Sequence, residues 1–194
     1  MIQTILSQNT NDVNSDRAMS RLRSKFEITP EALSTAPIDE IVECIRPAGL
    51  YRMKAPRIKD VSKIVLDQFG GNLDSILRKP PSEARSILMD FPGVGYKTAD
   101  ILLAFVAGHP TIPVDTHVMR VSKRLGMVRK NAGYEETRLA LEELVSPKRR
   151  LSMHLSLIRF GRKICRAPTP LCPICPVNRT CPSSTVRRRP SRRV

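Results

Sequence analysis

The sequence lacks an apolar run long enough to cross a membrane, and its N-terminus lacks the pattern of a secretory signal peptide. We therefore expect an intracellular protein that has no membrane partner. Strand-like runs of alternating apolar and polar residues are few and short, and no internal repeat is present. These absences disfavour a fold built on a sheet.

Acidic residues are too scarce to balance the basic ones. The 194 residues include 33 lysines and arginines against 18 aspartates and glutamates, which gives a formal net charge of +15. Such an excess suits a polyanionic partner, and nucleic acid is the leading candidate, although a solvated basic surface would give the same count. The length and the hydrophobic fraction of 41% suit one large globular domain or two small ones.

Helical periodicity extends along nearly the whole chain and predicts an all-α fold. Thr29-Pro30-Glu31 and Pro37-Ile38-Asp39 have the pattern of helix starts, whereas Gly70-Gly71 and Gly108 have the pattern of helix ends. Apolar residues recur at intervals of three and four in segments 13–26, 37–46, 54–69, 82–90, 96–107, 116–125, 134–145 and 148–164.

The stretch "FPGVGYK", residues 91–97, places a turn between two of these helices. Pro92 ends the first helix, and Gly93 and Gly95, on either side of Val94, permit backbone angles that other residues resist. Such a turn leaves backbone N–H groups pointing outward at the start of the second helix, where they can bind phosphate. Most turns of this kind only connect helices, so the stretch alone leaves both readings open.

Lys97 lies at the start of the second helix, where the positive end of the helix dipole disfavours a cation. The same charge favours the neutral amine, which can act as a nucleophile; the alternative is an ordinary surface lysine. Asp115, in "PVDTHVMRV", precedes another amphipathic segment, where an aspartate is commonly a helix N-cap. Each residue alone is ambiguous, and the pair at this spacing is the informative feature.

Four of the five cysteines lie close together near the C-terminus, in the pattern Cys165-x6-Cys172-x2-Cys175-x5-Cys181. This grouping indicates a metal site rather than disulfides. Structural zinc usually takes two short Cys-x-x-Cys pairs, and only one is present, so a [4Fe–4S] cluster is favoured over zinc. Cys44 lies within the helical pattern "IDEIVECI" and is expected to be a buried apolar residue.

Together these motifs resemble the endonuclease III family of DNA glycosylases, in the helix-hairpin-helix superfamily. The resemblance covers nearly the whole chain, from "LSQNTNDVN" through "GLYRMKA", "FPGVGYKTAD" and "VDTHVMRV" to the four cysteines. It implies a helical barrel domain containing the hairpin at 1–109, a helical [4Fe–4S] domain at 110–182, and an active-site cleft between them. Residues 183–194 contain five arginines and almost nothing apolar, which predicts a disordered basic tail.

The resemblance also implies a mechanism and catalytic residues. The damaged base rotates out of the duplex into a pocket, Lys97 attacks C1′ of the sugar, and Asp115 assists. The Schiff base on Lys97 then permits β-elimination, which cuts the strand 3′ to the lesion. The cysteines Cys165, Cys172, Cys175 and Cys181 would hold the cluster, whose expected role is structural.

DNA contacts follow from the same resemblance. The hairpin residues Gly93, Val94 and Gly95 would bind the backbone. Leu50 matches a position that wedges into the gap left by the flipped nucleotide, with a core leucine as the alternative. Gln8 and Asn9 are both candidates for the opposite wedge. His117 matches a histidine of the family motif, which implies a supporting role near the sugar-phosphate, with a helix-surface histidine as the alternative. Arg166 is the only cation between the first two cysteines and is a further candidate for a phosphate contact.

The predicted function is therefore base excision by a bifunctional DNA glycosylase and AP lyase that acts on oxidised pyrimidines in double-stranded DNA. We expect a monomer in the cytoplasm or nucleoid. A uracil or thymine mismatch glycosylase on the same scaffold is the alternative, because the pocket residues are not recognisable from the sequence. A DNA-binding module without chemistry is disfavoured, because it would leave Lys97 and Asp115 without a role.

Overall fold

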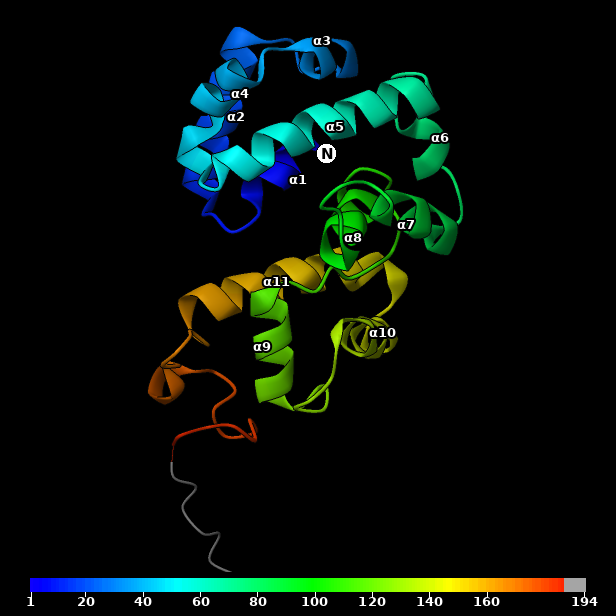
Figure 1. Cartoon of the computed structure of the whole chain (residues 1–194). Coiled ribbons are helices and arrows are strands. Elements are labelled where there is room, and N and C mark those ends of the chain that lie inside the picture. Colours follow the sequence, from blue (N-terminus) through cyan, green and yellow to red (C-terminus); the bar gives the residue numbers. More distant parts are fainter. Residues whose placement is uncertain (187–194) are drawn as a thin grey trace, which may run out of the picture. The chain divides into compact units, whose positions relative to one another are not determined.

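The structure is a computed structural model that describes residues 1–186 (Figure 1). Within these residues the regular structure is α-helical or 3-10 helical, and no strand is present, so the predicted all-α class is confirmed. None of the described helices is both long and apolar enough to cross a membrane. The chain divides into two compact units, with the boundary after Gly108. Most of the predicted basic tail, from residue 187 on, lies outside the described residues.

The first unit contains eight α-helices and one 3-10 helix. They are α1 (Ile2–Ser7), α2 (Asp12–Lys25), α3 (Pro30–Thr35), α4 (Ile38–Ile45), η1 (Arg46–Ala48), α5 (Tyr51–Phe69), α6 (Asp74–Leu77), α7 (Pro81–Met89) and α8 (Tyr96–Phe105). The long helix α5 packs against α1, α3 and α4, while α7 packs against α8 (Figure 1).

The described part of the second unit contains three α-helices and two 3-10 helices. They are α9 (Thr116–Leu125), α10 (Tyr134–Leu144), η2 (Pro147–Arg149), α11 (Arg150–Lys163) and η3 (Cys172–Ile174). Helix α9 packs against both α10 and α11, and the segment after α11 carries the clustered cysteines.

Local signals in the sequence set most of the helix boundaries. The side chain of Asn11 caps α2 by accepting from Asn14 N, and Thr29 caps α3 by accepting from Ala32 N. Gly70 ends α5 in the left-handed conformation, as the Gly70-Gly71 pair predicts.

The structure also differs from the predicted boundaries. Helices α1 and α6 have six and four residues, too short for the periodicity to reveal them, and α3 was marked only by its start. Helix α8 ends at Phe105, so Gly108, with φ of +70°, is not its cap. Helix α5 begins at Tyr51 rather than residue 54, because Leu50 serves as its N-cap.

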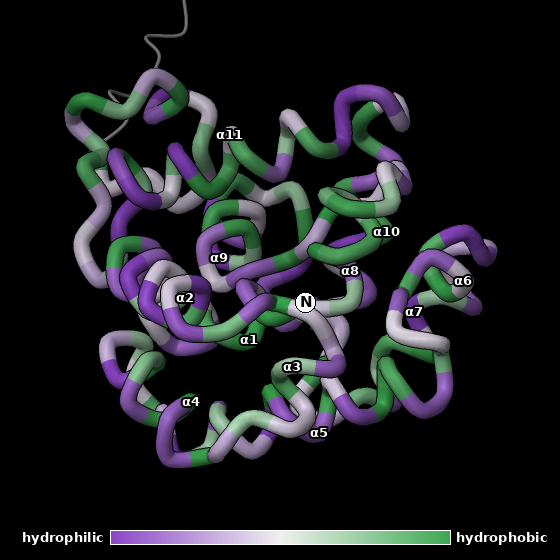
Figure 2. The backbone as a smooth tube through the Cα atoms, turned by 90° about the horizontal axis from the view of Figure 1, so that it is seen from above, coloured by the Kyte–Doolittle hydropathy of each residue, from purple (hydrophilic) through white to green (hydrophobic). Residues whose placement is uncertain are grey.

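Each unit has its own apolar core. Figure 2 shows hydrophobic and hydrophilic segments alternating along the helices, the pattern by which an amphipathic helix buries one face. In the first unit α2, α4, α5 and α8 contribute to the core, which includes Cys44 as predicted. In the second unit α9, α10 and α11 contribute through Val118, Val121, Leu141 and Leu157.

Candidate functional site

The turn between α7 and α8 is fixed by residues on both of its sides. Phe91 and Val94 are buried in the core beneath it. Gly93 has φ of +73°, and a Cβ at this position would lie only 2.2 Å from Nε of Arg57. The left-handed backbone therefore favours glycine at position 93, and any larger residue would also have to displace the Arg57 side chain.

Gly95 departs from the sequence-based interpretation. Its φ of −108° and ψ of −177° are extended values that any residue adopts, and a Cβ there would meet no described atom within 4 Å. The fold itself therefore does not require glycine at this position. As the N-cap of α8, Gly95 adds no side chain, so the first amide groups of the helix stay uncovered, which is the condition for binding phosphate.

A buried ion pair holds the two helices of the hairpin together. Nε of Arg85, on α7, lies 2.7 Å from Oδ1 of Asp100, on α8, and the Asp100 side chain is completely buried. The sequence interpretation missed this pair. Its signal is the aspartate within the otherwise apolar stretch "ADILLAF".

Lys97 is the second residue of α8 and its side chain is exposed. The residues that follow, Thr98 and Ala99, are buried and anchor the first turn of the helix to the core. The amine therefore lies on the surface of a rigid element rather than on a loop, which suits a group that must meet a substrate in a defined geometry.

Gln8 and Asn9, the two candidates for one wedge, have different surroundings. Gln8 Nε2 donates to Gly93 O at 2.9 Å and to Thr98 Oγ1 at 3.3 Å, while Gln8 Oε1 accepts from Arg57 at 3.0 Å. Asn9 is exposed and has φ of +53°, in the left-handed region. Gln8 is thus engaged with the hairpin, and Asn9 projects at the tip of the loop.

Leu50 is a surface residue rather than a core leucine. It is 47% exposed, it is the N-cap of α5, and its φ of +48° is unusual for a branched side chain. Gly49 before it also has positive φ, at +64°. The two residues turn the chain sharply and leave Leu50 on the outside of the turn.

Asp115 begins the second unit's first helix as its N-cap. Its Oδ1 accepts from Val118 N at 2.7 Å, so the capping role foreseen from the sequence is present. The cap uses Oδ1 alone, and the half-buried carboxylate lines an open depression with Thr116, Met119 and Arg120. Capping holds the carboxylate in one orientation and is compatible with a catalytic role.

His117 lies in the first turn of α9, close to an arginine. Its Nδ1 is 3.1 Å from Nη2 of Arg120. The same Nη2 donates to Gly161 O at 3.0 Å, and Nε of Arg120 donates to Cys165 O at 3.1 Å. Helices α9 and α11 approach closely here, since a Cβ at Gly161 would lie 3.1 Å from Cβ of His117. The arginine therefore links the segment of Asp115 and His117 to the start of the cysteine segment.

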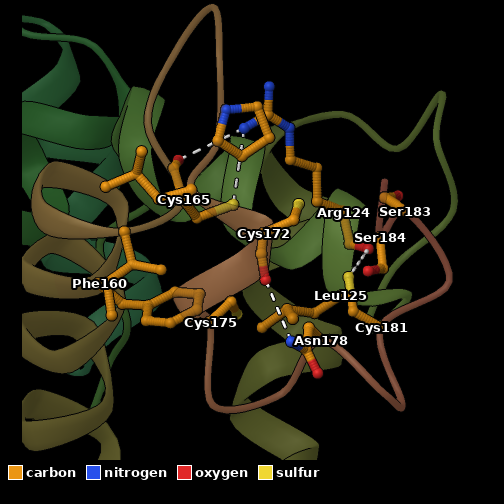
Figure 3. A pocket seen from close by; sticks show the side chains of 13 residues that line it. Arg124, Leu125, Phe160, Cys165, Cys172, Cys175, Asn178, Cys181, Ser183 and Ser184 are labelled. Atoms are coloured by element: carbon orange, nitrogen blue, oxygen red, sulfur yellow. Dashed lines mark hydrogen bonds between the residues drawn. The ribbon is translucent and has the colours of Figure 1, made fainter. Parts of the chain in front are cut away.

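The four clustered cysteines line one pocket at the C-terminal end of the second unit (Figure 3). Arg124, on α9, lies beside them and donates to the carbonyls of Cys165, Arg166 and Pro168, at 3.4, 2.7 and 3.2 Å. Its backbone carbonyl accepts from Cys181 Sγ at 3.3 Å. The sequence interpretation missed Arg120 and Arg124; their only signal is a pair of arginines one turn apart on α9.

The chemistry of these thiols fits a metal centre. All five cysteines are free thiols, and hydrogen bonds from Thr185 lower the pKa of Cys172, which favours the thiolate that a metal requires. Burial instead raises the pKa of Cys44, in keeping with an apolar role. No three cysteine, histidine or carboxylate side chains among residues 1–186 are arranged as ligands of one metal ion. Four thiols around a single pocket nevertheless provide the donor set of a [4Fe–4S] cluster.

The candidate residues are divided between the two units. Lys97, the hairpin turn, the Gln8-Asn9 loop and Leu50 belong to the first unit, and within it hydrogen bonds of Gln8 join the loop to the hairpin. Asp115, His117 and the four cysteines belong to the second unit. Arg166 is exposed in the segment between the first two cysteines, with its carbonyl held by Arg124.

Comparison with known proteins gives a consistent result. Residues 2–147 match the HhH-GPD superfamily of base excision DNA repair proteins. Over 183 residues the chain is 37% identical to endonuclease III of Thermotoga maritima, covering 93% of this chain and 80% of that protein. A solved structure of a trapped endonuclease III–DNA covalent intermediate is similar with a TM-score of 0.84 at 35% identity, covering 94% of this chain and 82% of that one. A thermostable thymine-DNA glycosylase is similar with a TM-score of 0.74 at 25% identity, over 94% and 82% of the two chains.

The matched region contains the hairpin, Lys97 and Asp115, and the similarity to endonuclease III continues beyond it over nearly the whole chain. The helix-hairpin-helix fold predicted from the sequence is thereby confirmed. The chain belongs to the HhH-GPD superfamily of base excision DNA repair proteins and, within it, to the endonuclease III family.

Proposed function

We propose that this protein is a bifunctional DNA glycosylase and AP lyase that removes oxidised pyrimidines from double-stranded DNA. Base excision repair by a glycosylase/lyase follows from membership of the endonuclease III family. The observation that carries the bifunctional assignment is Lys97, an exposed amine in the first turn of the hairpin's second helix. We assign the first compact unit to the helical barrel domain and the second to the cluster domain.

The DNA backbone would be held at the hairpin. Gly93 and Gly95 leave the first amides of α8 uncovered, and these N–H groups bind a phosphate without reading the sequence. The exposed Arg166 of the cysteine segment adds a second phosphate contact. The net charge of +15 supports this attraction over a longer range.

The damaged nucleotide must leave the duplex before its glycosidic bond can react. Leu50, exposed on a left-handed turn, is suited to fill the gap in the stack. Asn9 is suited to the opposite side, because it projects from its loop while Gln8 is bound to the hairpin.

Lys97 then acts as the nucleophile. Its neutral amine forms a bond to C1′, and the bond from C1′ to the base breaks, with the base taking the electron pair and a proton. Asp115 accepts the proton that the lysine nitrogen loses, or balances the positive charge that develops on the sugar. Opening of the sugar ring gives a Schiff base at C1′. Loss of a proton from C2′ then expels the 3′ phosphate, which breaks the strand by β-elimination.

The four clustered cysteines would hold a [4Fe–4S] cluster. When bound, the cluster would cross-link the segments that carry the four cysteines, so its contribution would be structural. Arg124 would fix the backbone of Cys165 and Arg166 beside it, and so position the phosphate-binding side chain of Arg166. We expect the protein to act as a monomer.

A thymine mismatch glycosylase is the second candidate, supported by the similarity to a thermostable thymine-DNA glycosylase. Related mismatch enzymes have a tyrosine at the position that corresponds to Lys97. This chain has its tyrosine, Tyr96, one position earlier. Tyr96 therefore does not replace the lysine, and the presence of Lys97 favours the enzyme with lyase activity.

One experiment separates these candidates. Duplexes containing thymine glycol, dihydrouracil, uracil or thymine opposite guanine, or an abasic site are treated with the protein in the presence of borohydride. The proposal predicts excision of the oxidised pyrimidines and a protein–DNA adduct that Lys97→Ala abolishes. Efficient excision of mismatched thymine without an adduct would support the second candidate, and native adduct yield with Lys97→Ala would place the nucleophile elsewhere.

A further inference from the structure

Two loops in the first unit carry the only non-glycine residues with positive φ among those the structure describes. Asn9 has φ of +53° in the loop after α1, and Leu50 has φ of +48° in the turn after η1. Side chains other than glycine rarely adopt this conformation, and it persists only where the surrounding structure holds the chain in place. Something must therefore restrain each of these loops.

Lys54 contacts the segments leading into both loops. It lies on α5, is only 2% exposed, and its Nζ donates to Leu6 O at 2.8 Å and to Ala48 O at 2.9 Å. Leu6 is in the last turn of α1, three residues before Asn9, and Ala48 ends η1, two residues before Leu50. One ammonium group thus bridges the two chain segments.

The chemistry of this bridge is unusual for a structural contact. Carbonyls in the last turn of a helix lack intrahelical partners and carry partial negative charge, so a cation stabilises them. Burial nevertheless disfavours the ammonium, and together with the charge of Arg57 it lowers the pKa of Lys54. An apolar side chain would fill the same space without this cost, but it would leave the two carbonyls unpaired and the two segments unconnected.

Arg57 extends the same arrangement one turn along α5. It donates to Gln8 Oε1 at 3.0 Å, and Gln8 in turn donates to Gly93 O at 2.9 Å. Residues three apart lie on one face of a helix. This face of α5 therefore contacts the Asn9 loop, the Leu50 turn and the hairpin.

We propose that Lys54 is a positioning residue that holds the loops of Asn9 and Leu50 in register, so that both side chains enter the duplex together. The inference rests on the proposed glycosylase function. Lys54 does not touch the substrate; it prepares the two loops before DNA binds, so that little ordering is required when the nucleotide flips out. Its loss should therefore impair flipping far more than the chemistry at C1′.

The test compares two reactions of Lys54→Met, whose side chain has similar length and no donor. Single-turnover excision of dihydrouracil from a fully paired duplex requires flipping, whereas cleavage at a preformed abasic site breaks less stacking. We expect excision to slow at least about tenfold and abasic-site cleavage to change by less than about threefold. The fluorescence rise of 2-aminopurine placed opposite the lesion, which reports loss of stacking, should decrease in parallel.

Lys59→Met is the matched control. Lys59 is on the same helix, is half-buried, and donates to one carbonyl, that of Ala36, away from both loops. It should leave the ratio of the two rates at the native value even where it lowers Tm. All rates are measured well below the melting temperature of each variant.

The inference is wrong if a folded Lys54→Met slows both reactions equally, or slows neither. If Lys54→Met does not fold, Lys54→Gln, whose shorter side chain ends in an uncharged amide instead of an ammonium group, replaces it and the same ratio decides. A native protein that neither excises bases nor cleaves abasic sites would instead refute the proposed function. The two failures are therefore distinguishable.

Discussion

Gln8 donates a 2.9 Å hydrogen bond to the carbonyl of Gly93, across 85 residues of sequence. The bond joins the loop after α1 to the hairpin turn that precedes Lys97. It also commits the Gln8 side chain to the protein, because Arg57 occupies its carbonyl oxygen. The neighbouring Asn9 remains on the exposed tip of the loop.

This arrangement predicts different results for substitutions at the two adjacent positions. Asn9→Gly should slow excision from a paired duplex while leaving the melting temperature nearly unchanged, because glycine adopts the left-handed φ of +53° without strain and the change removes only an exposed side chain. Gln8→Ala should lower stability by about 1 kcal/mol, since it leaves Gly93 O and Arg57 without their partner. Thermal melts and single-turnover rates measure both effects. A slower excision for Gln8→Ala at native stability would reverse the assignment.

The two roles of Asp115 can also be separated. Asparagine caps helices about as well as aspartate, so Asp115→Asn should keep both stability and DNA affinity. It removes the negative charge, and excision should fall by about a hundredfold or more. Asp115→Ala should lose the same activity and in addition about 1 kcal/mol of stability. Loss of DNA binding in proportion to excision for Asp115→Asn would leave Asp115 as a cap alone.

Glu142 should make the second unit sensitive to acid. Burial acts to raise the pKa of Glu142, but hydrogen bonds from Thr111, the amide of Ile112 and the guanidinium of Arg138 outweigh it, so the pKa is lowered on folding. The resulting stabilisation is complete above the ordinary pKa of a glutamate. It disappears as pH falls through the lower value of the folded state.

Glu142→Gln should therefore destabilise the protein by about 2 kcal/mol at neutral pH, because it removes one of the two carboxylates that pair with the buried guanidinium of Arg138 and leaves only Glu135. The difference from the native protein should narrow as the pH falls into the acid range. Glu136→Gln is the control on the same helix, since its pair with Arg129 is exposed and screened by water. Urea denaturation at several pH values measures both variants; a difference independent of pH would contradict the prediction.

The cysteine cluster makes a prediction about metal content. Protein purified without oxygen should be brown and contain iron and sulfide. Cys175→Ser removes one of the four thiols of the pocket, so it should lose iron and melt at a lower temperature. Cys44→Ser should retain the native iron content, because Cys44 is buried in α4 and does not line the pocket. Zinc without iron or sulfide in the native protein would overturn the assignment.

The residues that local chemistry determines were predictable from the sequence. Thr29 and Asp115 cap helices because their oxygens reach an amide three residues on, and Gly70 ends α5 because it adopts the left-handed conformation without strain. Amphipathic periodicity revealed the longer helices for the same reason. It did not reveal α1 and α6, which are too short to form without tertiary packing.

The sequence by itself thus determined the helical class, the family, and the motifs that contain Lys97, Asp115 and the four cysteines, because each is a pattern of neighbouring residues. Only the tertiary structure decided what residues distant in sequence do to one another. In the folded protein Gln8 is hydrogen-bonded to the hairpin, and Leu50 is exposed. The backbone conformation at position 95 does not require a glycine. The tertiary structure also buried the ammonium of Lys54 between the carbonyls of Leu6 and Ala48. From the sequence alone, a lysine in an amphipathic helix is expected to be solvated. Lys54 is buried because tertiary packing brings the C-terminal ends of α1 and η1 together, and their carbonyls accept hydrogen bonds from its ammonium group.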